Sequence, residues 1–170
     1  MNHRELIKKV GQVAYEFEKT HTGCSQCVVG AFKMVLGNKI SDEVFKASTG
    51  FSGGIGLMGG TCGAFIGGVI ILSNFLGREY KNFNDPEEII KENYHLVIKL
   101  ANLFKKKYCS YICKNIQEKI MGKSFNFWDP DEYKAFLAAG GDEDKCPGVC
   151  QNSARWVMEI LIKNNLLANK

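Results

Sequence analysis

The stretch Gly50–Gly68, GFSGGIGLMGGTCGAFIGG, decides the fold because it joins a glycine-rich segment directly to the most apolar segment of the chain. Seven of the fourteen residues from 50 to 63 are glycine, which lets the backbone turn back tightly. Thr61 is a good N-cap for the apolar segment 62–76, and Gly77 is a good stop signal after it. The sequence therefore predicts a glycine-rich loop followed by a buried apolar helix.

Residues 54–59 also match the GxGxxG pattern of dinucleotide-binding loops. Such a loop follows a β-strand within a βαβ unit, whereas the residues before this one, DEVFKASTG, are charged and helical in pattern. Small residues recur every four positions on two adjacent faces of the predicted helix, namely Gly60, Ala64 and Gly68, and Gly63 and Gly67. We therefore interpret the glycines as loop and helix-packing residues, and not as a nucleotide site.

Helical signals extend along the whole chain. Apolar stripes with helical spacing indicate helices over 24–36 and 147–167, and Asp85 followed by Pro86 indicates a further helix start with proline at its first position. No segment has the alternating pattern of a strand. The sequence predicts an all-α fold, a single-domain bundle of six to eight helices that spans residues 1–170.

Composition excludes two classes of partner. The chain has 170 residues and a net charge of +4, and its lysines are spread out without the aromatic-interleaved basic stripe that nucleic-acid binding requires. The most apolar stretch, 64–72, is far shorter than the roughly 20 residues of a membrane span. The N-terminus resembles an amphipathic helix and not a signal peptide. We expect a cytoplasmic protein that binds neither nucleic acid nor membranes.

Seven cysteines are the unusual feature of the composition. Three pairs have helical spacing on apolar stripes, which predicts that each pair lies on one inward face of one helix: Cys24/Cys27, Cys109/Cys113 and Cys146/Cys150. Cys62 lies directly after the expected N-cap, where the helix dipole and free N–H groups stabilise a thiolate, so we expect a lowered pKa. A buried cysteine is often only a small apolar side chain, but this arrangement favours one shared thiol or metal site.

The spacings exclude several known sites but do not name an occupant. Attachment of a c-type haem needs CxxCH, and Val28 follows Cys27. The ferredoxin run of closely spaced cysteines is absent, and a thioredoxin-like motif lacks its βαβ context. His21 could act as a ligand or as a base for Cys24, although a solvated role is more common for such a residue.

Four segments together resemble the C-GCAxxG-C-C family, whose members are described as redox-active. They are GCSQ around Cys24, GGTCGAFIGG around Cys62, the segment at Cys113, and KCPGVCQNSA around Cys146. The resemblance covers about residues 4–163, with Gly23 in place of the asparagine usual in the family. It implies that these four cysteines bind the cofactor or metal. Cys27, Cys109 and Cys150 occupy positions usually apolar in the family, which leaves them open as extra ligands, resolving thiols or core side chains.

The family is also similar to the non-haem part of the split-Soret cytochromes c, for which an iron–sulfur cluster has been proposed. This similarity implies a helical homodimer with a cysteine-ligated iron–sulfur cluster. Our leading hypothesis is therefore electron transfer or redox sensing together with a redox partner protein, as an accessory protein without substrate turnover of its own. Two alternatives stay open. One is a metal-free thiol–disulfide oxidoreductase with Cys62 as the nucleophile, and the other is a structural zinc or metal-binding module.

Overall fold

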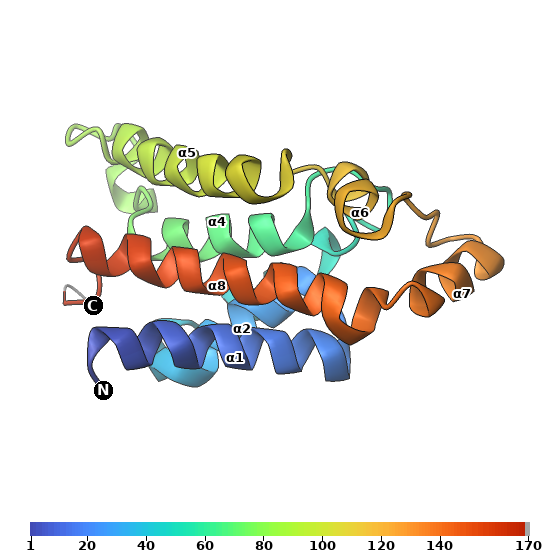
Figure 1. Ribbon diagram of the computed structural model, residues 1–170. Helices are drawn as coiled ribbons and strands as arrows, with labels where there is room; N and C mark the ends of the chain where they lie inside the picture. The colour runs from blue at the N-terminus through green and yellow to red at the C-terminus, as the bar shows by residue number, and fades with distance from the viewer. Residues whose placement is uncertain (169–170) are drawn as a thin grey trace.

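The computed structural model describes residues 1–168, which form one all-α domain (Figure 1). Its α-helices are α1 His3–His21, α2 Cys24–Leu36, α3 Asp42–Ala47, α4 Gly63–Phe75, α5 Ile89–Tyr108, α6 Cys113–Met121, α7 Pro130–Ala138 and α8 Cys146–Lys163. Three short 3₁₀ turns, η1 Gly37–Lys39, η2 Thr49–Phe51 and η3 Tyr80–Asn82, and a π-helical turn, η4 Gly141–Lys145, complete the regular structure. No strand occurs within the described range, which confirms the all-α prediction.

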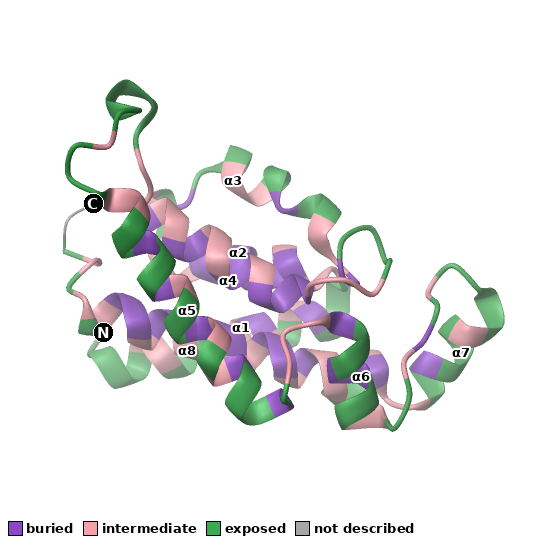
Figure 2. Cartoon of the chain, turned by 90° about the horizontal axis from the view of Figure 1, so that it is seen from above, coloured by how far each residue is buried: buried purple, intermediate pink, exposed green. Residues whose placement is uncertain are grey.

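The long helices lie side by side. α1 packs along α8 and against α2, and α4 packs against α2, α5 and α8, while α6 and α7 lie at one end of the bundle (Figure 1). The buried faces of α2 and α4 meet in the interior (Figure 2). The core contains large side chains that are fully buried, including Phe32, Ile71, Leu72, Leu100, Phe104 and Leu161.

The small residues of α4 allow this close packing. A Cβ at Gly67 would lie 2.7 Å from the carbonyl oxygen of Ser25 in α2, and one at Gly68 would lie 2.8 Å from the side chain of Leu100 in α5. Both distances are too short for an added carbon. The prediction that α4 carries two adjacent faces of small residues for close helix packing is therefore confirmed.

Three helix boundaries differ from the expected ones. Cys62 itself is the N-cap of α4, because Thr61 forms an isolated antiparallel bridge with Ile112. α5 begins at Ile89, and Asp85 caps it from four residues away by accepting hydrogen bonds from two backbone N–H groups. α8 begins at Cys146 and ends at Lys163, earlier than expected.

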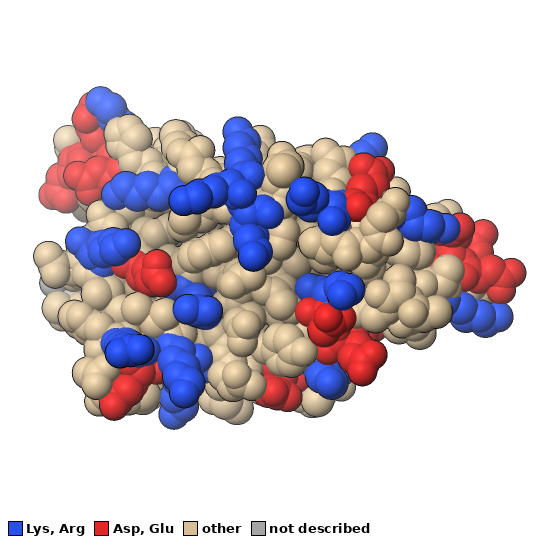
Figure 3. All heavy atoms as spheres, in the orientation of Figure 1, with Lys and Arg blue, Asp and Glu red and all other residues tan. Residues whose placement is uncertain are grey.

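The surface carries charges of both signs. On the face shown in Figure 3, lysine and arginine side chains are spread over most of the molecule, and acidic side chains stand among them. Within residues 1–168, no helix combines the length and apolar character needed to cross a bilayer.

Candidate functional site

A cavity of about 350 Å³ lies at the end of the bundle that carries α6 and α7. Five of the seven cysteines line it: Cys24, Cys62, Cys113, Cys146 and Cys150. Aromatic side chains on and before α7 form another part of the wall, and one of them, Tyr133, is 38% exposed. The cavity therefore extends from the buried ends of the helices towards the surface.

Each of four cysteines occupies the N-terminus of a different helix. Cys24 is the first residue of α2, Cys113 the first of α6 and Cys146 the first of α8, and Cys62 is the N-cap of α4. Helix N-termini carry partial positive charge and unpaired N–H groups, which favour thiolates and other anions. Four such termini thus meet around one cavity.

The glycine-rich loop makes room for these cysteines. The Sγ of Cys24 lies directly against the Cα of Gly63, where a Cβ would overlap it. A Cβ at Gly54 would lie 2.9 Å from the Cβ of Cys113. The backbone N–H of Cys113 also donates to the carbonyl of Gly60, at 2.6 Å. The loop is therefore packed against two of the cysteines that line the cavity.

Without a bound cation, burial keeps these thiols protonated. Burial raises the pKa of Cys62 to about 12, although the N–H groups of Phe65 and Ala64 act in the opposite direction. Burial likewise raises the pKa of Cys113 to about 12, and holds the pKa values of Cys24, Cys146 and Cys150 well above the ordinary value. The expectation that the helix terminus lowers the pKa of Cys62 is therefore wrong, because desolvation outweighs the terminus.

The two remaining cysteines do not line the cavity. Cys27 is buried, and its Sγ lies 3.1 Å from the carbonyl oxygen of Thr22. Cys109 is exposed, because α5 ends at Tyr108 and Cys109 turns away with a φ of 63°. The prediction that Cys109 and Cys113 share one inward helix face is therefore wrong, since a helix break separates them.

Glu18 is a site residue that the sequence interpretation missed. It lines the cavity from α1 and is only 4% exposed, and its Oε2 has no hydrogen-bond partner. The signal was present in the sequence, because Val10, Ala14 and Glu18 recur every four residues on the buried face of α1. Asp142, from η4, is a second carboxylate in the wall.

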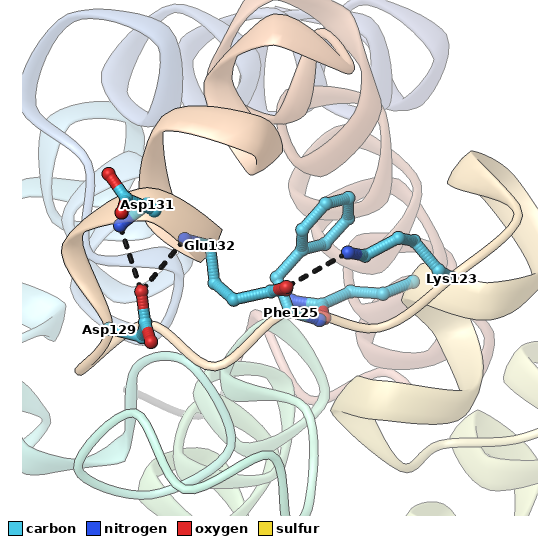
Figure 4. A network of polar contacts seen from close by, with 6 residues as sticks. Lys123, Phe125, Asp129, Asp131 and Glu132 are labelled. Carbon is cyan, nitrogen blue, oxygen red and sulfur yellow. Dashed lines mark hydrogen bonds and ion pairs between the residues drawn. The ribbon is translucent and has the colours of Figure 1, made fainter.

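The segment before α7 is fixed to α6 beside the cavity. The side-chain oxygen of Gln117 accepts from the backbone N–H of Phe125 at 3.0 Å, and its amide nitrogen lies 3.7 Å from the Sγ of Cys113. Lys123 forms an ion pair with Glu132 at 3.1 Å, and Asp129 caps α7 (Figure 4). These contacts connect the position of α7 to that of Cys113.

The histidines lie outside the site. His3, His21 and His95 are exposed, and none of them lines the cavity. Within the described part of the chain, no three His, Cys, Asp or Glu side chains are grouped so that they could hold a metal ion as they stand.

The comparisons with known proteins give one result. The family model described as "Putative redox-active protein (C_GCAxxG_C_C)" matches residues 22–160. No curated protein and no solved structure matches the chain. The matched range contains all seven cysteines and the whole glycine-rich loop.

Proposed function

The chain belongs to the C_GCAxxG_C_C family of redox-active proteins, and on this premise we propose that it binds an iron–sulfur cluster for electron transfer or redox sensing. The observation that carries the proposal is the meeting of four cysteine-bearing helix N-termini around one cavity. Cluster ligation by four cysteine thiolates is the commonest arrangement for such centres. The proposed ligands are Cys24, Cys62, Cys113 and Cys146.

Hydrogen-bond donors at the starts of the helices favour an anionic assembly of this kind. A cluster with four thiolates supplies one-electron chemistry when it is bound, and its potential depends on hydrogen bonds to the sulfurs and on solvent exposure. Burial holds the pKa of Cys24 well above its ordinary value, but the N–H of Gly53 and the hydroxyl of Ser52 hydrogen-bond to its Sγ and act in the opposite direction. The N–H groups of Ala64 and Phe65 act similarly on Cys62. The chain thus provides N–H donors beside two of the proposed ligands.

Binding would require both deprotonation and movement of the thiols. Metals bind the thiolate, so the raised pKa values mean that loading releases protons. We assign Cys150 to the cavity wall and not to the ligand set, because its Sγ points to the carbonyl oxygen of Cys24, at 3.7 Å. Cys27 lies outside the cavity and is assigned to the core.

The thiol–disulfide alternative has weaker support. Its nucleophile would be Cys62, and thiol–disulfide exchange proceeds through the thiolate. Burial raises the pKa of Cys62 to about 12, so the thiolate fraction at neutral pH is very small. A zinc module remains the other alternative, and metal analysis separates it from a cluster.

The test is anaerobic purification followed by a visible spectrum and assays of iron, zinc and acid-labile sulfide on one sample. We expect brown protein with iron and sulfide in wild type, loss of both in Cys62→Ser, and retention of both in Cys109→Ser. Cys109 is the matched control because it is an exposed cysteine outside the cavity. Zinc without sulfide, or no metal after reconstitution, would overturn the proposal.

The proposal also covers the cellular compartment of the protein, its redox partner and its oligomeric state. All seven cysteines are free in the structure, which agrees with a reducing compartment, and we propose the cytoplasm. We further propose that the protein exchanges electrons with a one-electron redox partner protein and acts as an accessory protein, as a homodimer.

A further inference from the structure

The buried carboxyl group of Glu18 presents an unused hydrogen-bond acceptor in the cavity wall. The side chain is 4% exposed, and its Oε2 has no hydrogen-bond partner. Two neighbouring thiols are directed elsewhere. The Sγ of Cys27 donates to the carbonyl oxygen of Thr22, at 3.1 Å. The Sγ of Cys150 is directed at the carbonyl oxygen of Cys24, at 3.7 Å. Because an unpaired buried polar atom is costly and rare in native proteins, this oxygen points to a ligand with a hydrogen-bond donor.

The side of the cavity formed by α1 and η4 carries acidic groups without a counter-charge. Asp142 of η4 is a second, half-buried carboxylate in the wall. Within residues 1–168, neither Glu18 nor Asp142 forms an ion pair. Among the described residues, no lysine, arginine or histidine lines the cavity. Since a buried carboxylate is stabilised by a paired opposite charge, this side of the cavity favours a cationic ligand.

Aromatic rings form another wall of the same cavity. Phe127, Tyr133 and Phe136 line it and contact one another, with ring centroids 4.8 to 6.2 Å apart. The aliphatic side chains of Ile116 and Val149 add to the apolar lining. Aromatic faces attract cations and also pack well against aromatic ligands. A mostly apolar cavity of about 350 Å³ with a few polar groups is typical of a small-molecule site.

We propose that the cavity binds a small organic amine in its ammonium form, with an aromatic body. The ammonium group donates a hydrogen bond to Glu18, and the carboxylate of Asp142 adds to the attraction. The body of the ligand packs against the wall formed by Phe127, Tyr133 and Phe136. This inference goes beyond the proposed function. Its test uses metal-free protein, so that the amine site and the iron–sulfur centre can fail separately.

The experiment titrates reduced, metal-free protein with phenethylamine at pH 8 by isothermal titration calorimetry. Two ligands of similar size but different charge are compared, the neutral 2-phenylethanol and the anionic phenylacetate. Wild type should bind the amine at least tenfold more tightly than the alcohol, because the alcohol lacks the charge-assisted hydrogen bond, and should bind phenylacetate most weakly. Glu18→Gln should lose the preference for the amine. Glu16→Gln is the control, because Glu16 is an exposed carboxylate on the same helix, and it should behave like wild type.

A second measurement locates the ligand in wild type, and so keeps the inference testable if Glu18→Gln does not fold. Protein with ¹³C-labelled methyl groups should show nuclear Overhauser contacts from phenethylamine to Ile116 and Val149, which line the cavity. Ile71, which is fully buried elsewhere in α4, should show none. The inference would be overturned by the absence of saturable binding at millimolar phenethylamine, by equal affinity for 2-phenylethanol in wild type, by an unchanged preference in Glu18→Gln, or by contacts only outside the cavity.

Discussion

At the scale of single residues, Glu18 connects the stability of the protein to pH. Its pKa is raised to about 7 in the folded protein, above the ordinary 4.5 of an exposed carboxyl. Between these pH values the folded state keeps a proton that the unfolded state has lost. The free energy of unfolding should therefore fall as the pH rises from about 4.5 to about 7, and stay low above that range. At 1.36 kcal/mol per pKa unit, the total loss is of the order of 3 kcal/mol.

Urea unfolding of the reduced, metal-free protein at pH 5, 6, 7 and 8 measures this effect. Glu18→Gln should lack this fall in stability and should be more stable than wild type at pH 8, because a neutral amide replaces a buried ion. Glu16→Gln should follow wild type. Equal slopes in all three proteins would show that Glu18 titrates as an ordinary exposed carboxyl.

The residues of the site differ in how far they could be predicted. The motif around each of the four proposed ligands could be recognised, and the structure places all four at one cavity. The exposure of Cys109 could not be predicted, because it depends on a left-handed residue ending α5 in the middle of an apolar stripe. Glu18 could have been found from the stripe that it shares with Val10 and Ala14.

At the scale of elements, the start of α4 sets the position of Cys24. Gly63 is the first residue of α4, and its Cα lies against both the Sγ of Cys24 and the carbonyl of Phe51. Gly63→Ala would force these groups apart, and overpacking of this kind costs about 1–3 kcal/mol. We expect Gly63→Ala to lower the free energy of unfolding by that amount and to reduce iron and sulfide content after reconstitution.

The control for this prediction is Gly148→Ala. Gly148 lies in α8, and a Cβ there would meet nothing within 4 Å. Alanine at a helical position free of clashes should stabilise by up to about 1 kcal/mol and leave metal content unchanged. If Gly63→Ala behaved like Gly148→Ala in urea unfolding and metal assays, the close contact with Cys24 would have no functional importance.

The elements themselves were largely predictable, but their ends were not. The start of α5 illustrates the limit, since Asp85 does cap the helix, but a left-handed residue at Glu88 delays its start to Ile89. The loop before α4 is a second example. Ile55 and Leu57 adopt positive φ angles that glycine normally occupies, and the hydrogen bond from Leu57 N–H to the carbonyl of Ser52 helps to hold them there. The backbone preferences of the individual residues predict neither the left-handed conformation of Glu88 nor the positive φ angles of Ile55 and Leu57.

At the scale of the whole molecule, the largest side chains of the core do not line the cavity, although smaller core residues such as Cys62 and Val149 belong to both. The fully buried side chains of the bundle, such as Phe32, Leu72, Leu100 and Leu161, pack without a cofactor. The cavity lies at one end, beside the glycine-rich loop, α6 and α7. The bundle should therefore fold without a metal, while the cavity end should become more ordered when the centre is bound.

Hydrogen exchange of the metal-free and the reconstituted protein tests this division. We expect the metal-free, reduced protein to keep its helical circular dichroism and to unfold cooperatively, since its core is complete. Reconstitution should slow amide exchange in 50–62 and 109–146, and leave the first half of α5 unchanged. A structural zinc module makes the opposite prediction, because metal binding then supplies the folding free energy and a chelator unfolds the protein. Loss of helix throughout the bundle on chelation would therefore favour the zinc alternative over a redox centre carried by an independently stable fold.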